Sequence, residues 1–209
     1  AAHTLYEKSH PYLLPGPGGT ANLQMCEFIQ ESEGIVKVVG SRFERSEEYR
    51  VKLEGAKESG YRTIFVAGIR DPQAIKQIDE ILRAADTVIA EHFPHATRRN
   101  GYVWDYKVYG RNGVMGQLEP KCGEVGHEIC LVAEFLAPTQ EEASALCSLA
   151  RSTMLHYHYR GRYATAGNFA FPFAPSDIEV GKAYEFNVYH TVPISDPRTF
   201  FPTEYITLG

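Results

Sequence analysis

The stretch "TIFVAGIRDPQAIKQIDEILRAADTVIAEHFP", residues 63–94, predicts a buried strand followed by a helix. Its first seven residues are mostly apolar and rich in β-branched side chains, which is typical of a buried strand. Asp71 and Pro72 mark a helix start, because aspartate is favoured at the N-cap and proline at the first helical position. The apolar residues that follow recur every three or four positions and share one helical face: Ile75, Ile78, Leu82, Ala85, Ile89 and Phe93.

A similar pattern returns later in the chain, with two strands between the helices. Residues 102–109 alternate between aromatic or apolar and polar side chains, and residues 128–136 read as another strand. Thr139 and Glu142 form a capping box for a second helix, and residues 184–192 predict a last strand. The order β-α-β-β-α-β predicts an α+β, ferredoxin-like fold, with an antiparallel sheet and helices on one face.

The segment before this body predicts a β-rich extension. Residues 1–22 read as irregular, because the run "PGPGGT" within them disfavours helix and inner strand. Two short apolar runs between residues 25 and 39 predict a β-hairpin, and residues 49–53 predict a third strand. We therefore predict an N-terminal arm with hairpin and strand at 1–60 and a ferredoxin-like body at 61–209. Whether the first part extends the sheet or forms its own stays open.

Composition narrows the class of partner. The chain has 209 residues, of which 44% are hydrophobic and 22% charged, as in ordinary globular domains. The net charge is −5 and no block of lysine and arginine exceeds a pair, which argues against nucleic acid as a partner. No apolar run approaches the roughly 18 residues of a membrane span, and no signal peptide is visible. We expect a cytoplasmic protein without a membrane partner.

The cysteines and the first residue add two expectations. None of the cysteines forms a C-x-x-C pair, so we expect buried free thiols, as suits a reducing compartment. The four are Cys26, Cys122, Cys130 and Cys147. The chain begins with Ala1 instead of methionine, so we expect a trimmed, processed or partial chain.

The commoner catalytic motifs are weak or missing. Histidines occur in pairs near the ends of both predicted helices, at His92 and His95 and at His156 and His158. A zinc site needs three or four ligands, and no third ligand is near either pair, so we predict no metal site. No nucleophile motif occurs, and no cofactor is indicated. The carboxylates Asp105 and Glu134 lie on strand faces that suit either a cleft or a solvated surface.

The loop "GRYATAGNFAFPFAPSD", residues 161–177, is unusually apolar for a connection between a helix and a strand. Its phenylalanines can pack on the core and so keep a long connection ordered. Its few polar side chains include Arg162, Asn168 and Asp177. Long loops in compact domains are usually functional or disordered, and this one is too apolar for disorder. An ordered plug and a binding or interface role both remain open, and the two can coexist.

Three segments resemble the acyclic terpene utilisation (AtuA-like) family. They are "YRVKLEGAKESGYRTIFVAGIRDP" (49–72), "EFLAPTQEEASALCSLARSTMLHYHYRGRYATAGNFAFPFAPSD" (134–177) and "YEFNVYH" (184–190). The resemblance implies a place in the catabolism of branched carboxylates and acyl-CoA thioesters. It also implies a large α/β region ahead of a stretch like this one. This chain would then be the C-terminal portion, working with a larger α/β partner chain or a missing N-terminal domain in a hetero-oligomer.

The first functional hypothesis is part of a cytoplasmic enzyme acting on small or branched carboxylic acids or their acyl-CoA thioesters. The reaction would be that of a lyase, hydratase or isomerase. Arg162 or Arg70 would bind the substrate carboxylate, because a guanidinium matches its two oxygens. Asn168 and Asp177 would orient the substrate or exchange protons with it. The site would lie between this part and its partner, because ligand sites favour domain interfaces.

The alternative hypothesis is a structural or assembly subunit without catalytic activity. Its exposed sheet and aromatic loop would bury against a partner chain, since aromatic side chains are enriched at interfaces. Tyr102, Trp104 and Tyr106 would supply the anchor, because the alternation of residues 102–109 places them on one strand face.

Overall fold

The computed structural model describes residues 10–121, 123–165 and 168–208. Parts of three predictions fall outside these ranges: residues 1–9 of the predicted arm, Cys122 among the free cysteines, and the glycine at 167 that precedes Asn168.

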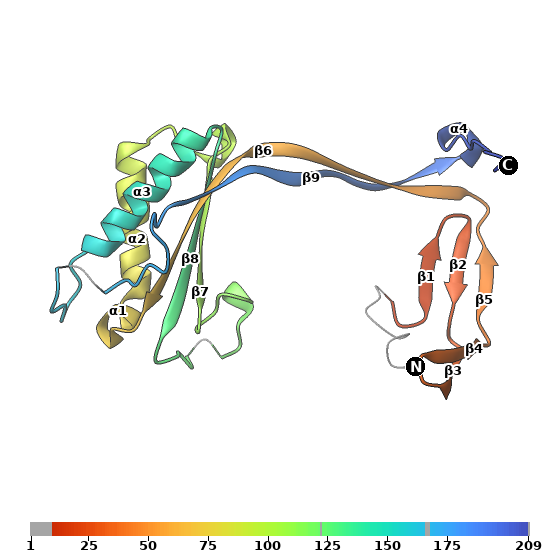
Figure 1. The fold of residues 1–209 in the computed structure, drawn as a ribbon, viewed down its shortest axis with the longest axis horizontal. Helices are drawn as coiled ribbons and strands as arrows, with labels where there is room; N and C mark the ends of the chain where they lie inside the picture. The colour runs from red at the N-terminus through yellow and green to blue at the C-terminus, as the bar shows by residue number, and fades with distance from the viewer. Residues whose placement is uncertain (1–9, 122, 166–167, 209) are drawn as a thin grey trace. The chain divides into compact units, whose positions relative to one another are not determined.

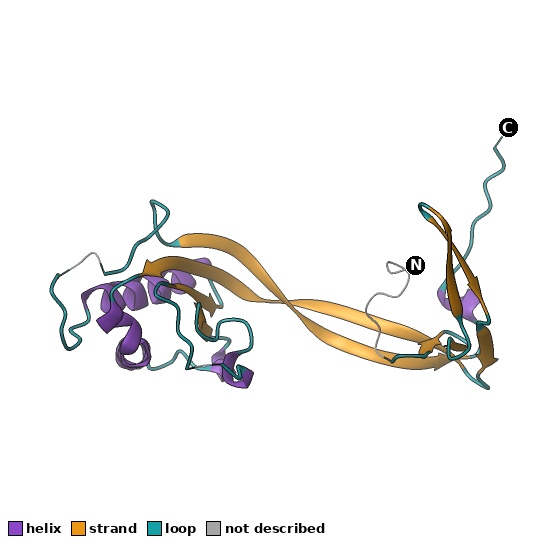
Figure 2. Ribbon diagram, turned by 90° about the horizontal axis from the view of Figure 1, so that it is seen from below, coloured by secondary structure: helices purple, strands orange, loops and turns teal. Residues whose placement is uncertain are grey.

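The chain divides into two compact units that are described separately below. The first unit comprises Ala1–Ala56 and Phe186–Gly209, and the second unit comprises Lys57–Glu185. Two long strands, β6 (Tyr49–Ile69) and β9 (Ile178–Ile194), contribute residues to both units. They are neighbours in one sheet, and Figures 1 and 2 show them running side by side.

The first unit holds two small antiparallel sheets in its described part. The three-stranded sheet has the order β1-β2-β5, and β3 pairs with β4 as a hairpin. The bounds are β1 Leu13–Gly16, β2 Gly19–Asn22, β3 Glu27–Ser32, β4 Ile35–Val39 and β5 Arg42–Arg45. The hairpin predicted between residues 25 and 39 is confirmed. A short helix, α4 (Pro197–Phe200), follows β9.

Within the segment expected to be irregular, β1 and β2 are strands, so the prediction is wrong for residues 13–16 and 19–22. Pro15 lies on β1, an edge strand, where a missing backbone N–H is tolerated. Gly18, between the two strands, has a φ of 74°, a left-handed conformation that glycine adopts without strain. The proline and glycines thus allow a tight hairpin instead of excluding strand.

The second unit contains the helices that the periodicity predicts. They are α1 (Pro72–Lys76), α2 (Ile78–His92) and α3 (Gln140–His156). Asp71 accepts a hydrogen bond from the backbone N–H of Gln73 at 2.8 Å, and Thr139 caps α3 through the N–H of Glu142. The first predicted helix is interrupted at Gln77, which has a φ of −107° and divides α1 from α2.

The sheet of the second unit has the order β7-β8-β6-β9. Strands β7 (Val103–Tyr109) and β8 (Ile129–Ala137) pair antiparallel, and β8 pairs antiparallel with residues 61–69 of β6. Figure 1 shows α2 and α3 side by side against this sheet. Alternate residues of the strands face the helices and form one apolar core. Its fully buried side chains include Phe65, Ile69, Ile81, Ile89, Leu131, Phe135 and Leu146.

The predicted ferredoxin-like fold, with helices on one face of an antiparallel sheet, is wrong as the class of this chain. The described chain is mostly sheet and only 24% helical, and its largest sheet curls as an antiparallel half-barrel. The prediction failed at β6, because the sequence pattern predicts two separate strands at residues 49–53 and 63–69. The residues between them stay extended, so β6 is one strand of 21 residues and its neighbour β9 has 17.

The cysteines partly follow the prediction. Cys26, Cys130 and Cys147 are free thiols among the described residues. Cys147 is fully buried against the core, and this burial raises the pKa of its thiol. Cys26 and Cys130 are only half-buried, so the expectation of buried thiols is wrong for these two.

Candidate functional site

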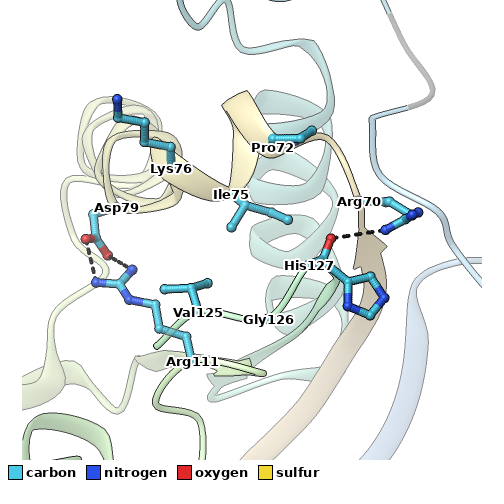
Figure 3. A pocket seen from close by; sticks show the side chains of 9 residues that line it. All are labelled: Arg70, Pro72, Ile75, Lys76, Asp79, Arg111, Val125, Gly126 and His127. Carbon is cyan, nitrogen blue, oxygen red and sulfur yellow. Dashed lines mark hydrogen bonds and ion pairs between the residues drawn. The ribbon is translucent and has the colours of Figure 1, made fainter. Parts of the chain in front are cut away.

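A cavity of about 910 Å³ opens in the second unit beside the end of β6. We call it the Arg70 pocket. This volume lies within the range of ligand sites for small molecules. The residues that line it are Arg70, Pro72, Ile75, Lys76, Asp79, Arg111, Val125, Gly126 and His127. Figure 3 shows Arg70 and His127 at one end, Arg111 and Asp79 at the other, and Ile75 and Val125 between them.

Arg70 is the cationic group at the first end. It follows directly on the last residue of β6, and its side chain is exposed. One terminal nitrogen, Nη1, donates to the backbone oxygen of His127 at 3.3 Å. A guanidinium carries five N–H donors, so this contact leaves others available. No carboxylate of the described residues forms an ion pair with Arg70, which makes it a candidate for binding an anionic ligand.

Arg111 and Asp79 neutralise each other at the second end. The two terminal nitrogens of Arg111 donate to the two carboxylate oxygens of Asp79, both at 2.8 Å. The hydrogen bonds from Arg111 hold the pKa of Asp79 below its usual value, so the carboxylate stays ionised at neutral pH. This end therefore carries a fixed ion pair instead of a free positive charge.

The middle of the pocket is apolar. Ile75 and Val125 face each other across it, and Pro72 adds a third apolar wall (Figure 3). Lys76 lies at the rim, and its ammonium group is directed away from Ile75. The arrangement suits a ligand with one anionic end, at Arg70 and His127, and an apolar body.

Local structure holds both sides of the pocket. Asp71 caps α1 and also accepts a hydrogen bond from the buried Tyr159 hydroxyl at 2.5 Å, which anchors the start of α1 next to Arg70. On the other side, Gly110 turns the chain after β7 with a φ of 88°. Its oxygen accepts from the N–H of Gly126 at 2.9 Å. This bond holds the loop before β8 close to Arg111.

The predicted site residues of the loop 161–177 lie away from the Arg70 pocket. The Arg162 guanidinium donates to the backbone oxygens of Leu155 at 2.9 Å and Tyr157 at 2.5 Å, and also to those of Ala164 and Thr165. The side-chain amide of Asn168 donates to the oxygen of Ala164 at 3.4 Å. Both side chains thus bind the backbone of their own loop, and Arg162 also binds the end of α3.

Asp177 lines a different cavity, of about 700 Å³, together with Phe173 and Ile178. Its carboxylate accepts from Arg151 at 2.5 and 3.1 Å, and both side chains are largely buried. The structure therefore does not bring Asp177 and Arg70 to one pocket. The roles predicted for Asp177, Asn168 and Arg162 remain predictions.

The aromatic anchor of the alternative hypothesis faces inward. Tyr102 is buried, and Trp104 and Tyr106 pack against the core. The Trp104 indole and the Tyr106 hydroxyl both donate to Asp86 of α2, at 2.8 and 3.1 Å. Trp104 and Tyr106 thus hold the sheet to α2, and the Tyr102 hydroxyl donates to Glu142 of α3 at 2.6 Å. None of the three presents a face to a partner, so the prediction of a Tyr102–Trp104–Tyr106 anchor is wrong.

The prediction that the phenylalanines of the loop pack on the core is confirmed for two of the three, although most described residues of the loop are exposed, including Tyr163. Phe169 is buried and Phe171 packs at the edge of the Phe65 ring, with 6.1 Å between ring centres. Only Phe173 among the three phenylalanines is exposed. Of the two strand carboxylates, Glu134 pairs with Arg62 at 2.6 Å, and Asp105 pairs with Lys107 at 3.1 Å.

Two pocket residues, His127 and Arg111, were not identified from the sequence. Each lies at a turn flanking a predicted strand. Arg111 lies in "GRNG" after β7, and His127 lies in "EVGHE" before β8. The signal available was their position at strand ends, where the chain turns at glycine. Over the described ranges, no group of three His, Cys, Asp or Glu side chains is placed to hold a metal ion.

Comparison with known families, curated proteins and solved structures found no match to this chain. The resemblance to the AtuA-like family thus rests on the three quoted segments alone. No helix among the described residues has the length and apolar character needed to cross a membrane.

Proposed function

We propose that the chain binds a small branched carboxylate, or its acyl-CoA thioester, in the Arg70 pocket. The supporting observation is the exposed guanidinium of Arg70, without an ion-pair partner among the described residues, beside a cavity of about 910 Å³ whose middle is apolar. An arginine fork recognises a carboxylate through two parallel hydrogen bonds. The apolar middle of the pocket provides the contact for a branched hydrocarbon chain.

The ligand would lie with its anionic group at Arg70 and its chain toward Ile75 and Val125. Arg111 does not compete for the anion, because Asp79 binds both of its terminal nitrogens. The ion pair instead closes the far end with a group of no net charge. A thioester would extend from the same cavity, whose volume exceeds the needs of a short acid alone.

The reaction proposed for this ligand is that of a lyase, hydratase or isomerase, carried out together with a larger partner. These reactions transfer a proton at carbon or oxygen. His127 is the titratable side chain that lines the pocket at the Arg70 end, and histidine is suited to proton transfer near neutral pH. We assign His127 this role within the proposal.

Replacement of Arg70 tests the proposal directly. Titration calorimetry with 3-methylbutanoate and with its CoA thioester should give saturable binding to the full chain. Arg70→Ala should weaken that binding by about 10- to 100-fold, because one charge-assisted interaction contributes roughly 1.5–3 kcal/mol. Arg70→Lys should recover only part of the affinity, since an ammonium group cannot form the two parallel bonds.

The matched control is Arg98→Ala. Arg98 is also exposed, lies in the same unit, and does not line the pocket. It should leave the affinity unchanged. Equal losses for Arg70→Ala and Arg98→Ala would indicate a general effect of charge, and the proposal would fail. No binding by the unaltered chain would reject it outright.

Replacement of Asp79 should have the opposite effect. Asp79→Asn removes the carboxylate that holds Arg111, so a second cation becomes available to the ligand. We expect about 3- to 10-fold tighter binding of a branched dicarboxylate such as 3-methylglutarate, whose second carboxylate lies toward Arg111, since a second partly exposed cation contributes roughly 1 kcal/mol. The pKa of Asp79 is lowered, so acid breaks this ion pair only below the usual carboxylate range. Unchanged or weaker binding at neutral pH would contradict this account of the pocket.

A further inference from the structure

An ion pair forms the far end of the Arg70 pocket (Figure 3). Arg111 comes from the turn after β7 and Asp79 from the first turn of α2, so the pair joins two sides of the cavity. Both terminal nitrogens of Arg111 reach the carboxylate at 2.8 Å. The Arg111 side chain is 23% exposed and that of Asp79 is 55% exposed, so a molecule in the pocket can reach the carboxylate.

The carboxylate of Asp79 can accept further hydrogen bonds. Its two oxygens offer about four lone-pair sites, and Arg111 occupies one on each oxygen. More than half of the Asp79 side chain is exposed, so the remaining sites face water or a ligand. A ligand group at this end therefore meets a hydrogen-bond acceptor directly beside a positive charge.

This pairing favours one kind of ligand group over others. An apolar group would strip water from Asp79 without replacing its hydrogen bonds, which costs affinity. A second carboxylate would be repelled by Asp79, and an ammonium group would be repelled by Arg111. A hydroxyl donates its proton to the carboxylate and turns its oxygen toward the guanidinium. Because it is neutral, it suits an end where the two charges already cancel.

The apolar middle of the pocket sets the position of this hydroxyl on the ligand. Ile75 and Val125 lie between Arg70 and the ion pair (Figure 3). A ligand with its carboxylate at Arg70 crosses this apolar stretch before its other end reaches Asp79. The hydroxyl therefore belongs at the opposite end of the hydrocarbon chain from the carboxylate, and not on a neighbouring carbon.

We propose that Asp79 is the specificity residue of the Arg70 pocket and selects branched acids that carry a hydroxyl at the end opposite the carboxylate. This inference rests on the proposed function, because it takes the carboxylate to lie at Arg70. It adds that Asp79 accepts the hydroxyl proton and disfavours a second anion. Specificity then has an attractive part and a repulsive part, which is how binding sites commonly discriminate.

Titration calorimetry of the full chain with three matched ligands tests the inference. The ligands are 5-hydroxy-3-methylpentanoate, 3-methylhexanoate and 3-methylglutarate, which share a branched chain with one carboxylate and end in a hydroxyl, a methyl and a second carboxylate. The hydroxy acid should bind about 3- to 10-fold more tightly than either of the others. The preference is modest because water competes for the exposed Asp79, whereas enclosed sites discriminate more strongly.

Asp79→Asn should reverse the order, so that 3-methylglutarate binds more tightly than the hydroxy acid. The reason is that Arg111 then attracts the second carboxylate instead of being neutralised. The matched control is Glu91→Gln, the same change of acid to amide at an exposed position of α2 outside the pocket. It should leave the order unchanged. Arg70→Ala should weaken the hydroxy acid and 3-methylhexanoate by the same factor, since both place a carboxylate there.

The outcomes distinguish a failure of this inference from a failure of the proposed function. If none of the three ligands binds, the carboxylate pocket is rejected and the inference falls with it. If 3-methylhexanoate binds through Arg70 at least as tightly as the hydroxy acid, the pocket stands and selection by Asp79 is overturned. An unchanged order in an Asp79→Asn variant that unfolds at the original temperature would also overturn it. If that variant does not fold, the three ligands on the unaltered chain decide.

Discussion

Phe135→Ala should lower the free energy of unfolding by about 3–5 kcal/mol, the usual cost of removing a fully buried aromatic side chain. Phe135 has 0% exposure and lies in β8, between β7 and β6. Its ring stacks on Phe65 and meets the edge of Tyr106, with 6.2 Å between ring centres in both pairs. The vacated space is enclosed by helices and neighbouring strands, so the core cannot collapse to fill it.

Urea unfolding followed by circular dichroism measures this loss. The control is Phe173→Ala, which removes the same side chain from an exposed position, and it should change stability by no more than about 0.5 kcal/mol. A similar cost for both substitutions would mean that Phe135 does not occupy the centre of the core.

Arg162→Ala should lower the free energy of unfolding by about 2–4 kcal/mol. Its guanidinium donates to four backbone oxygens, two at the end of α3 and two in the following loop. Loss of the side chain leaves these oxygens without their charged donor, and hydrogen bonds to charged groups contribute roughly 1.5–3 kcal/mol each, with incomplete additivity. Arg162→Lys should recover little, because an ammonium group cannot reach four acceptors arranged around a planar fork.

The matched control for this prediction is Arg160→Ala. Arg160 is two residues away and exposed, and among the described contacts only its backbone takes part in hydrogen bonds. It should leave the unfolding free energy within about 0.5 kcal/mol of the original. If Arg162→Ala left stability unchanged but abolished carboxylate binding, Arg162 would instead have the ligand-binding role that its residue type suggests.

Much of the second unit could be predicted from local pattern. The N-caps at Asp71 and Thr139 locate the starts of α1 and α3, and the 3.6-residue period of apolar residues continues through α2. The alternation of residues 102–109 predicts β7, and its aromatic face is the buried one. These features depend on neighbours in the sequence, which is why they can be read without the fold.

The fold class could not be predicted in the same way. Residues 54–62 contain charged side chains and two glycines, and this composition reads as a connection between strands. In the structure they continue β6, because β9 pairs alongside and side chains bridge the two strands. Lys57 binds Glu185, and Lys182 binds Glu58, both at 2.9 Å. The partners are more than 120 residues apart in sequence, so no local window contains the stabilising contact.

The candidate site likewise combines features that the local sequence determines with contacts that only the folded chain creates. Arg70 is recognisable in the sequence as a cation at the end of a buried strand, and the packing of Phe169 and Phe171 is recognisable from the apolar composition of their loop. The local sequence also sets the helices, their caps and the glycine turns, because these depend on conformational preference and short-range hydrogen bonds. Long-range packing brings His127, Arg111 and Asp79 into one pocket with Arg70, binds Asp177 to Arg151, and groups the second half of the last strand with the N-terminal sheets. Such contacts join distant segments through burial and charge, and their partners are defined only when the chain is folded.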